Sequence, residues 1–128
     1  MPVKVLSASA GSGKTFNLSM FYIKLAMEDA DNFKKILAIT FTNAAVNEMK
    51  NRILTRLFDL SKGDGIGEYR IYAAVNKNVS DEEISQRAGE VLNRIVHHYY
   101  DFSVSTIDSF LQRFFRGALY EIGLRTNY

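Results

Sequence analysis

Cysteine is absent from this chain of 128 residues, and proline occurs once, at Pro2. Without cysteine there is no disulfide framework and no thiolate zinc site, so a reducing cytoplasm is the expected compartment. The first residues, MPVKVLSASAG, contain no long apolar signal region, and no apolar run approaches the length of a membrane span. These absences predict a cytoplasmic protein without a membrane partner.

The composition is that of an ordinary globular chain. Apolar residues make up 47% and charged residues 23%, which is enough to bury a core. The length fits one domain or part of one. The net charge of +2 permits an anionic partner but does not require one.

Hydrophobic periodicity predicts alternating strands and helices. The predicted strands span 3–6, 36–41 and 102–106. The predicted helices span 13–27, 43–60 with Asn43 as cap, 68–79, 84–95 behind a capping box of Ser80 and Glu83, and 107–123. A loop is predicted at 61–67. This order predicts an α/β fold with a parallel sheet and helical crossovers. Three strands are few for a parallel sheet covered on both faces, so we expect part of a larger domain.

The stretch ASAGSGKT, from Ala8 to Thr15, matches the spacing of a phosphate-binding P-loop, with alanine in place of the first glycine. Gly11 and Gly13 permit the backbone amides to turn inward, and the N-terminus of the following helix attracts an anion. Lys14 can reach the β- and γ-phosphates, and Thr15 can place its hydroxyl on Mg²⁺. A glycine-rich turn that binds nothing is the alternative, but the strand before it and the helix after it favour nucleotide binding.

Two further segments place polar residues where a strand ends and a helix begins. In ILAITFTNAAVNEMKNRI (36–53), Phe41 could stack on a base while Thr42 or Asn43 bonds a backbone phosphate. The alternative is that Phe41 is core and Asn43 only a cap, and the residues alone favour this alternative. In VSTIDSFLQRFFR (104–116), Ser105 and Thr106 have the same placement and by themselves indicate no more than a helix cap.

Together the three segments resemble motifs of UvrD/Rep-type superfamily 1 DNA helicases. SASAGSGKTF resembles the Walker A motif, LAITFTNAAVNEMKNRI resembles motif Ia, and VSTIDSFLQRFFR resembles motif Ib. The sequence ASAGSGKTF and the long helical insert at about 61–100 resemble the RecB/AddA helicase–nuclease branch more closely than UvrD itself.

The resemblance implies a three-layer P-loop NTPase fold of the RecA-like type, with helices flanking a parallel sheet that is incomplete in this chain. Residues 1–128 would form the N-terminal part of motor domain 1A. ATP and Mg²⁺ would be the cofactors, with Lys14 and Thr15 as catalytic residues and Thr15 on the metal. The implied nucleotide contacts are Ala8, Ser9, Ala10, Gly11, Ser12, Gly13, Lys14, Thr15 and Phe16. The implied DNA contacts are Phe41, Thr42, Asn43, Ser105 and Thr106.

The implied activity is ATP-dependent translocation on single-stranded DNA, in a helicase–nuclease used in double-strand-break repair, with a nuclease domain or partner subunit. No Walker B acidic pair follows an apolar strand after Thr106. We therefore expect the 128-residue chain alone to bind nucleotide weakly and not to turn it over. The alternatives are another P-loop enzyme, such as a small-molecule kinase, or a non-catalytic nucleotide-binding module. A kinase would need an arginine-rich lid after the third strand, and the chain shows none.

The sequence also departs from the helicase pattern. Asp108 stands where motif Ib usually has histidine, and we expect its carboxylate to cap the final helix. The Gln motif that many of these helicases use to read adenine does not precede the first strand, which puts adenine selectivity in doubt. Adjacent His97 and His98 point in different directions and do not predict a metal site.

The final helix is strongly apolar. Its phenylalanines at 110, 114 and 115 predict a core stripe that packs on the sheet or on further domains, or drives self-association. Arg113 and Arg116 beside them predict a solvated face, with contact to DNA phosphate as the alternative.

Overall fold

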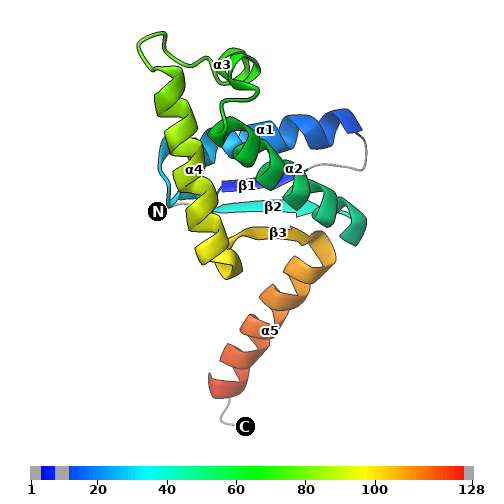
Figure 1. Cartoon of the computed structure of the whole chain (residues 1–128). Coiled ribbons are helices and arrows are strands. Elements are labelled where there is room, and N and C mark those ends of the chain that lie inside the picture. The colour runs from blue at the N-terminus through cyan, green and yellow to red at the C-terminus, as the bar shows by residue number, and fades with distance from the viewer. Residues whose placement is uncertain (1–3, 8–11, 126–128) are drawn as a thin grey trace.

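A computed structural model describes the backbone of residues 4–7 and 12–125 and the side chains of residues 17–119. Short strands alternate with helices along this part of the chain (Figure 1). The elements are β1 (Lys4–Ser7), α1 (Ser12–Glu28), the 3-10 turn η1 (Asn32–Lys35), β2 (Ile36–Thr40), α2 (Asn43–Ser61), α3 (Ile66–Ala73), α4 (Asp81–His97), the 3-10 turn η2 (Tyr99–Asp101), β3 (Ser103–Thr106) and α5 (Ile107–Arg125). The predicted α/β class is confirmed.

The three strands form one parallel sheet in the order β1-β2-β3. Leu37 of β2 is in register with Val5 of β1 and with Ser103 of β3. Thr40, the last residue of β2, is in register with Thr106, the last residue of β3. The carboxyl ends of β2 and β3 therefore lie side by side at one edge of the sheet.

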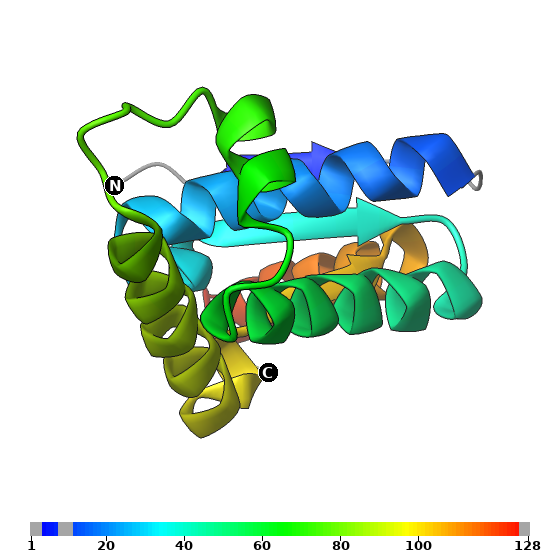
Figure 2. The same ribbon diagram turned by 45° about the horizontal axis from the view of Figure 1, so that its top comes forward.

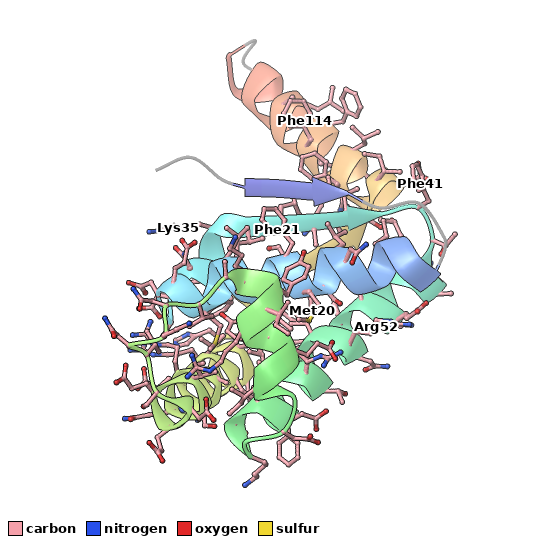
Figure 3. The ribbon with its side chains drawn as sticks, turned by 90° about the horizontal axis from the view of Figure 1, so that it is seen from above. Met20, Phe21, Lys35, Phe41, Arg52 and Phe114 are labelled. Carbon is pink, nitrogen blue, oxygen red and sulfur yellow. The ribbon has the colours of Figure 1, made fainter. Side chains whose placement is uncertain are left out.

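Helices cover the two faces of the sheet unequally. Helices α1, α2, α3 and α4 lie on one face, whereas α5 lies on the opposite face (Figure 3). Strand order follows chain order, so successive crossovers of one hand place their helices on the same face. Helix α5 contacts β2 and β3 and then runs away from the body of the molecule (Figure 1).

The core lies between the sheet and the four-helix face. Along β2, Ile36 and Ala38 belong to this core, and Leu37 and Ile39 lie on the opposite face, as the period of two in a strand requires. The side chains buried without measurable exposure include Tyr22, Ile23, Phe33, Met49, Ile53, Leu57, Leu60, Val91 and Ile95. Helix α2 supplies four of the core residues and packs against both α1 and α4, so it is the centre of the packing.

The structure corrects the predicted boundaries of the helical insert. Helix α3 begins at Ile66, inside the predicted loop, and ends at Ala73, where a helix was predicted as far as 79. Ala74 ends it with a left-handed φ of 50°. The Arg70 guanidinium, which donates to Val79 O and lies 2.8 Å from an Asp81 carboxylate oxygen, holds the next segment as a loop.

Helix α5 differs from its predicted role as a core stripe. Phe114 is 61% exposed and Leu119 is 65% exposed, and Phe115 and Leu111 are exposed as well. Of the predicted alternatives, packing of Phe114 and Phe115 on the sheet is wrong, because α5 meets the sheet through its first turns (Figure 1). Packing of the stripe on further domains stays a prediction. Over residues 4–7 and 12–125, no helix is both long enough and apolar enough to cross a membrane.

Candidate nucleotide and nucleic-acid site

Three strand-to-helix junctions lie at the carboxyl edge of the sheet. Helix α1 follows β1, α2 follows β2 and α5 follows β3, and all three start on the side to which the strand arrows point (Figure 1). A helix N-terminus carries free N–H groups and a positive partial charge. Three such ends along one edge suit it to contact anions such as phosphates.

The first junction contains the predicted P-loop. β1 ends at Ser7 and α1 begins at Ser12, so a strand precedes the loop and a helix follows it, as the motif requires. The predicted contacts Ala8, Ser9, Ala10 and Gly11 lie outside the described residues. The backbone of 12–16 forms the start of α1, but the side chains of these residues, Lys14 and Thr15 included, also lie outside the description. Their roles stay predictions.

At the second junction, Thr42 caps the N-terminus of α2. Its hydroxyl oxygen accepts a hydrogen bond from the backbone N–H of Ala45 at 3.0 Å. Asn43, the predicted cap, is instead the first residue of α2, so the prediction is wrong by one position. The exposed amide of Asn43 is consequently not used by the cap.

The third junction repeats this arrangement. The Thr106 hydroxyl oxygen accepts from the backbone N–H of Ser109 at 3.1 Å, at the start of α5. Asp108, the predicted cap, is exposed and makes no hydrogen bond within the described part of the chain. In both Thr42 and Thr106 the hydroxyl oxygen accepts from the helix, so each hydroxyl still has a proton to donate. Thr42 is exposed, whereas Thr106 is buried.

A groove of about 410 Å³ runs along the outer edge of β3, between α2 and α5. It brings together three of the five predicted DNA contacts, Asn43, Ser105 and Thr106. Its other lining residues come from α2, η2, α5 and the strand itself: Val46, Lys50, Tyr99, Tyr100, Phe102, Ser103, Val104, Ser109 and Arg113. Residues far apart in the sequence thus form one surface.

The groove is cationic. Lys50 and Arg113 are its charged lining residues, one on each wall, and neither forms an ion pair with a described residue. The Lys50 ammonium lies 5.3 Å from the centroid of the Tyr99 ring, and the neighbouring Tyr100 is fully exposed. This pairing of positive charge and aromatic rings is typical of surfaces that bind a single nucleic-acid strand.

Ser105 contributes an unused polar group to the groove. Its side-chain oxygen is buried and finds no hydrogen-bond partner among the residues that the structure describes. Leaving a buried hydroxyl unpaired is unfavourable, so such a group is often a place where a ligand or an ordered water binds.

Phe41 and Thr42 lie beside the groove and do not line it. Phe41 is 61% exposed and points to the side of the sheet on which α5 lies (Figure 3). The alternative that Phe41 is a core residue is therefore wrong. An exposed ring next to two helix N-termini can stack on a base.

Lys50, Tyr99 and Tyr100 were not predicted as members of this surface. For Arg113, contact with DNA phosphate was predicted only as the alternative to a solvated face. The spacing of residues along each helix could have identified the cations Lys50 and Arg113 as members of this surface. Lys50 follows Asn43 by seven residues and Arg113 follows Ser109 by four, so each shares a helix face with a groove residue. No local signal could have found the tyrosines, because η2 reaches the groove only through the tertiary fold.

In residues 17–119, no group of three or more histidine, cysteine, aspartate or glutamate side chains is placed to hold a metal ion. The His97 ring nitrogen Nδ1 lies 2.8 Å from the backbone oxygen of Asn93 on its own helix.

Known proteins resemble the chain over most of its length. Residues 2–128 match the UvrD/REP helicase N-terminal domain. The RecBCD enzyme subunit RecB of Buchnera aphidicola is 32% identical over 127 residues, covering 86% of this chain and 10% of that protein. An ATP-dependent helicase/nuclease protein of Bacillus cereus strain AH820 is 35% identical over 118 residues, covering 91% of this chain and 8% of that protein.

A shorter match reaches higher identity. The RecBCD enzyme subunit RecB of Chlamydia trachomatis is 47% identical over 53 residues, which cover 41% of this chain and 5% of that protein. The chain thus spans a tenth or less of the length of these relatives. No solved structure matches it. Since the family match covers nearly every residue and two relatives exceed 30% identity over most of the chain, this protein belongs to the UvrD/REP helicase N-terminal domain family.

Proposed function

We propose that this chain is the ATP-binding and DNA-contacting N-terminal part of an ATP-dependent DNA helicase of the helicase–nuclease type, which moves along single-stranded DNA during double-strand-break repair. The observation that carries the proposal is the carboxyl edge of the sheet. This edge carries three helix N-termini and two threonine caps, and the cationic groove lies at its β3 side.

We further propose that residues 1–128 form part of motor domain 1A with a three-layer, RecA-like fold. The parallel sheet with helices on both faces supports this reading. Helices α3 and α4 would be the helical insert at about 61–100, placed between the second and third strand ends.

The loop between β1 and α1 would hold the nucleotide. Its position at a helix N-terminus suits the phosphates of ATP, which residues 8–16 would surround with backbone N–H groups. Lys14 would contact the β- and γ-phosphates, and the Thr15 hydroxyl would bind Mg²⁺. Hydrolysis of the bound ATP would supply the free energy for movement along DNA.

The groove residues would follow the DNA backbone. Thr42 and Thr106 would donate their free hydroxyl protons to phosphate oxygens, and the Asn43 amide and Ser105 hydroxyl would add further hydrogen bonds. Lys50 and Arg113 would neutralise phosphates, as positive side chains do in single-strand channels. The exposed rings of Phe41 and the two groove tyrosines would stack on bases.

The relatives' names, which include the words RecBCD enzyme and helicase/nuclease, support a partner protein or domain with nuclease activity. The 128-residue chain by itself would not turn ATP over. Phosphoryl transfer needs a catalytic carboxylate and further charges around the phosphates, and Lys14 and Thr15 supply only part of that set.

ATP turnover by the full-length protein, measured with and without single-stranded DNA, tests this function. We expect strong stimulation by DNA. Lys14→Ala should lower turnover at least about 100-fold without a loss of thermal stability, because the lysine acts on the phosphates and not on the fold. Turnover indifferent to DNA would overturn the helicase proposal in favour of another P-loop enzyme. A loss of stability in Lys14→Ala would point to a structural nucleotide site.

Binding of single-stranded DNA by the full-length protein, measured over a range of salt concentrations, tests the groove. Arg113→Ala is compared with Lys62→Ala, a matched control that removes an exposed cation outside the groove. Arg113→Ala should weaken DNA binding regardless of base sequence. It should also reduce the slope of log affinity against log salt by about 0.7 for the lost phosphate contact. Equal effects of the two variants would contradict the proposed track.

A further inference from the structure

A series of aromatic rings runs from the groove along β3 to helix α1. The Lys50 ammonium lies over the Tyr99 ring, and the centroids of Tyr99 and Phe102 lie 5.8 Å apart. Phe102 in turn meets Tyr22 of α1 edge-on, at 5.7 Å between centroids. Tyr99 and Phe102 line the groove, whereas Tyr22 lies in the core. Tyr99, Phe102 and Tyr22 are called the ring series below.

The outer member of the ring series is open to a ligand, and the inner two are enclosed. The Tyr99 ring is 45% exposed at the groove, whereas Phe102 is 4% exposed and Tyr22 has no measurable exposure. Side chains in a close-packed interior do not move independently of one another. A displacement of Tyr99 would therefore be passed through Phe102 to Tyr22.

The Tyr22 ring is not fixed in place by a polar contact. Its hydroxyl is buried and finds no hydrogen-bond partner among the residues that the structure describes. An unpaired buried hydroxyl is unfavourable, so a shift of α1 that gave this group a partner would lower the free energy. The described position of α1 thus leaves a second arrangement open to it.

The carboxyl end of α1, by contrast, is held by the helical insert. Figure 2 shows α4 beside this end, and the Arg87 guanidinium of α4 donates to the backbone oxygens of Met27 at 3.1 Å and Glu28 at 3.2 Å. The last turn of α1 has no basic residue, so Arg87 supplies the positive charge and the donors that a helix end attracts. With this end held, a displacement at Tyr22 would tilt α1 and move its other end, which follows the predicted P-loop.

We propose that Tyr99, Phe102 and Tyr22 are positioning residues that couple the groove to the nucleotide site, so that a strand bound in the groove changes the affinity of the P-loop for ATP. A base stacked on Tyr99, and a phosphate that draws Lys50 away from it, would displace that ring. The inference rests on the proposed function, which takes the groove as the DNA site and residues 8–16 as the ATP site. By linkage, ATP would change the affinity for DNA by the same factor.

The two neighbouring groove tyrosines provide the sharpest test. Binding of a fluorescent, non-hydrolysable ATP analogue to the full-length protein is measured without DNA and with saturating oligothymidylate, and the ratio of the two Kd values is the coupling factor. We expect a coupling factor of at least about 5 in the parent and below about 2 in Tyr99→Leu. Tyr100→Leu is the matched control, because Tyr100 lines the same groove and has no ring contact among the described residues.

Both tyrosine variants should bind DNA more weakly, since each loses a ring that stacks on a base. Saturating DNA removes this loss from the coupling factor, so the factor reports on the ring series and not on DNA affinity. Tyr100→Leu should keep the coupling factor of the parent. Equal coupling factors in Tyr99→Leu and Tyr100→Leu would overturn the proposal.

A second pair of variants tests the inner end of the ring series. Tyr22→Leu removes the ring that meets Phe102, and Phe33→Leu removes an equally buried ring that has no ring contact among the described residues. Both should lower stability, but only Tyr22→Leu should bring the coupling factor below about 2. Tyr22→Phe keeps the ring and should keep the coupling. If Tyr22→Leu does not fold, the pair Tyr99→Leu and Tyr100→Leu still decides.

The parent protein separates failure of this inference from failure of the proposed function. A parent coupling factor near 1, together with ATP turnover that DNA stimulates, would overturn the coupling through the ring series and leave the helicase proposal standing. Absence of DNA binding by the parent would overturn both.

Discussion

The two faces of the sheet differ in how they bury apolar side chains. On one face, α1, α2 and α4 enclose residues such as Ile53 and Leu57 without measurable exposure. On the other face, α5 alone covers the sheet, and Phe114 and Leu119 remain more than half exposed (Figure 3). The apolar residues of α5 are as large as those of α2, so residue type does not explain the difference.

This difference indicates that the four-helix face stabilises the fold, whereas the α5 face presents exposed side chains to other molecules. Apolar area removed from water supplies most of the favourable free energy of folding, and here that area lies on the four-helix face. The α5 face contributes little burial and carries one wall of the groove along β3. A cluster of exposed apolar side chains is typical of an interaction surface, and self-association of the chain through α5 stays a prediction.

Truncation of a leucine on each face gives the largest expected contrast. Leu57→Ala should lower the free energy of unfolding by about 3 kcal/mol, because it leaves a cavity in the core. Leu119→Ala should change it by less than about 0.5 kcal/mol, because the side chain is 65% exposed. Urea unfolding of both variants checks this, and similar losses would show that α5 is packed in solution.

A buried hydroxyl without a partner occurs on each face: Tyr22 in the core and Ser105 beside α5. Tyr22→Phe should raise the free energy of unfolding by about 1 kcal/mol, since it removes an unpaired polar group and keeps the ring against Phe102 at 5.7 Å. Ser105→Ala also removes an unpaired buried hydroxyl, so it should not lower the free energy of unfolding, and it should weaken DNA binding. A Tyr22→Phe protein less stable than the parent would reveal a partner for the hydroxyl.

The same tyrosine predicts loss of stability at alkaline pH. Burial raises the pKa of Tyr22 far above its usual value, so the folded state keeps the phenol proton while the unfolded chain releases it near pH 10. Stability from this group is full below about pH 10 and falls above it by up to about 1.4 kcal/mol per pH unit. Unfolding measured from pH 8 to 11 should show a shallower decline in Tyr22→Phe. Tyr99→Phe, at an exposed ring, should keep the decline of the parent.

The two threonine caps give the smallest contrast. Thr42→Ala should cost about 1 kcal/mol of global stability, because α2 is central to the core. Thr106→Ala should cost about half as much, and mainly as local opening of α5, because the main contacts of that helix within the described part of the chain are with β2 and β3. Amide hydrogen exchange distinguishes local from global opening. Equal protection of α5 in the parent and in Thr106→Ala would contradict the assigned cap.

Helices and strands with a strong local signal were predicted well. β2 was predicted at 36–41 and spans Ile36–Thr40, and the Ser80 hydroxyl accepts from the Glu83 backbone N–H at 3.1 Å, as a capping box predicts. The prediction was wrong at 74–79, where the Arg70 side chain and a left-handed Ala74 end α3 early. Arg70 bonds residues nine and eleven positions away, which periodicity cannot detect.

In the candidate site, too, the sequence predicted the features with a local signal and did not predict those that depend on distant contacts. The order of P-loop, Thr42–Asn43 and Ser105–Thr106 along the chain could be read from the sequence, since each is a strand end followed by a helix. The pairing of Lys50 with the Tyr99 ring could not, because the two residues meet only after α4 has packed against α2. The Phe114 stripe was interpreted as core for a related reason: an apolar helix face has the same pattern whether it is covered or open.

By itself, the sequence determined the number and kind of the main elements, the glycine-rich loop and the family, because capping, periodicity and motif spacing act over a few residues. The tertiary structure alone decided the strand order, the face that each helix covers and the groove along β3. These features depend on contacts between segments far apart in the chain. Such contacts form only where the combined burial of several elements outweighs the conformational entropy lost on ordering them.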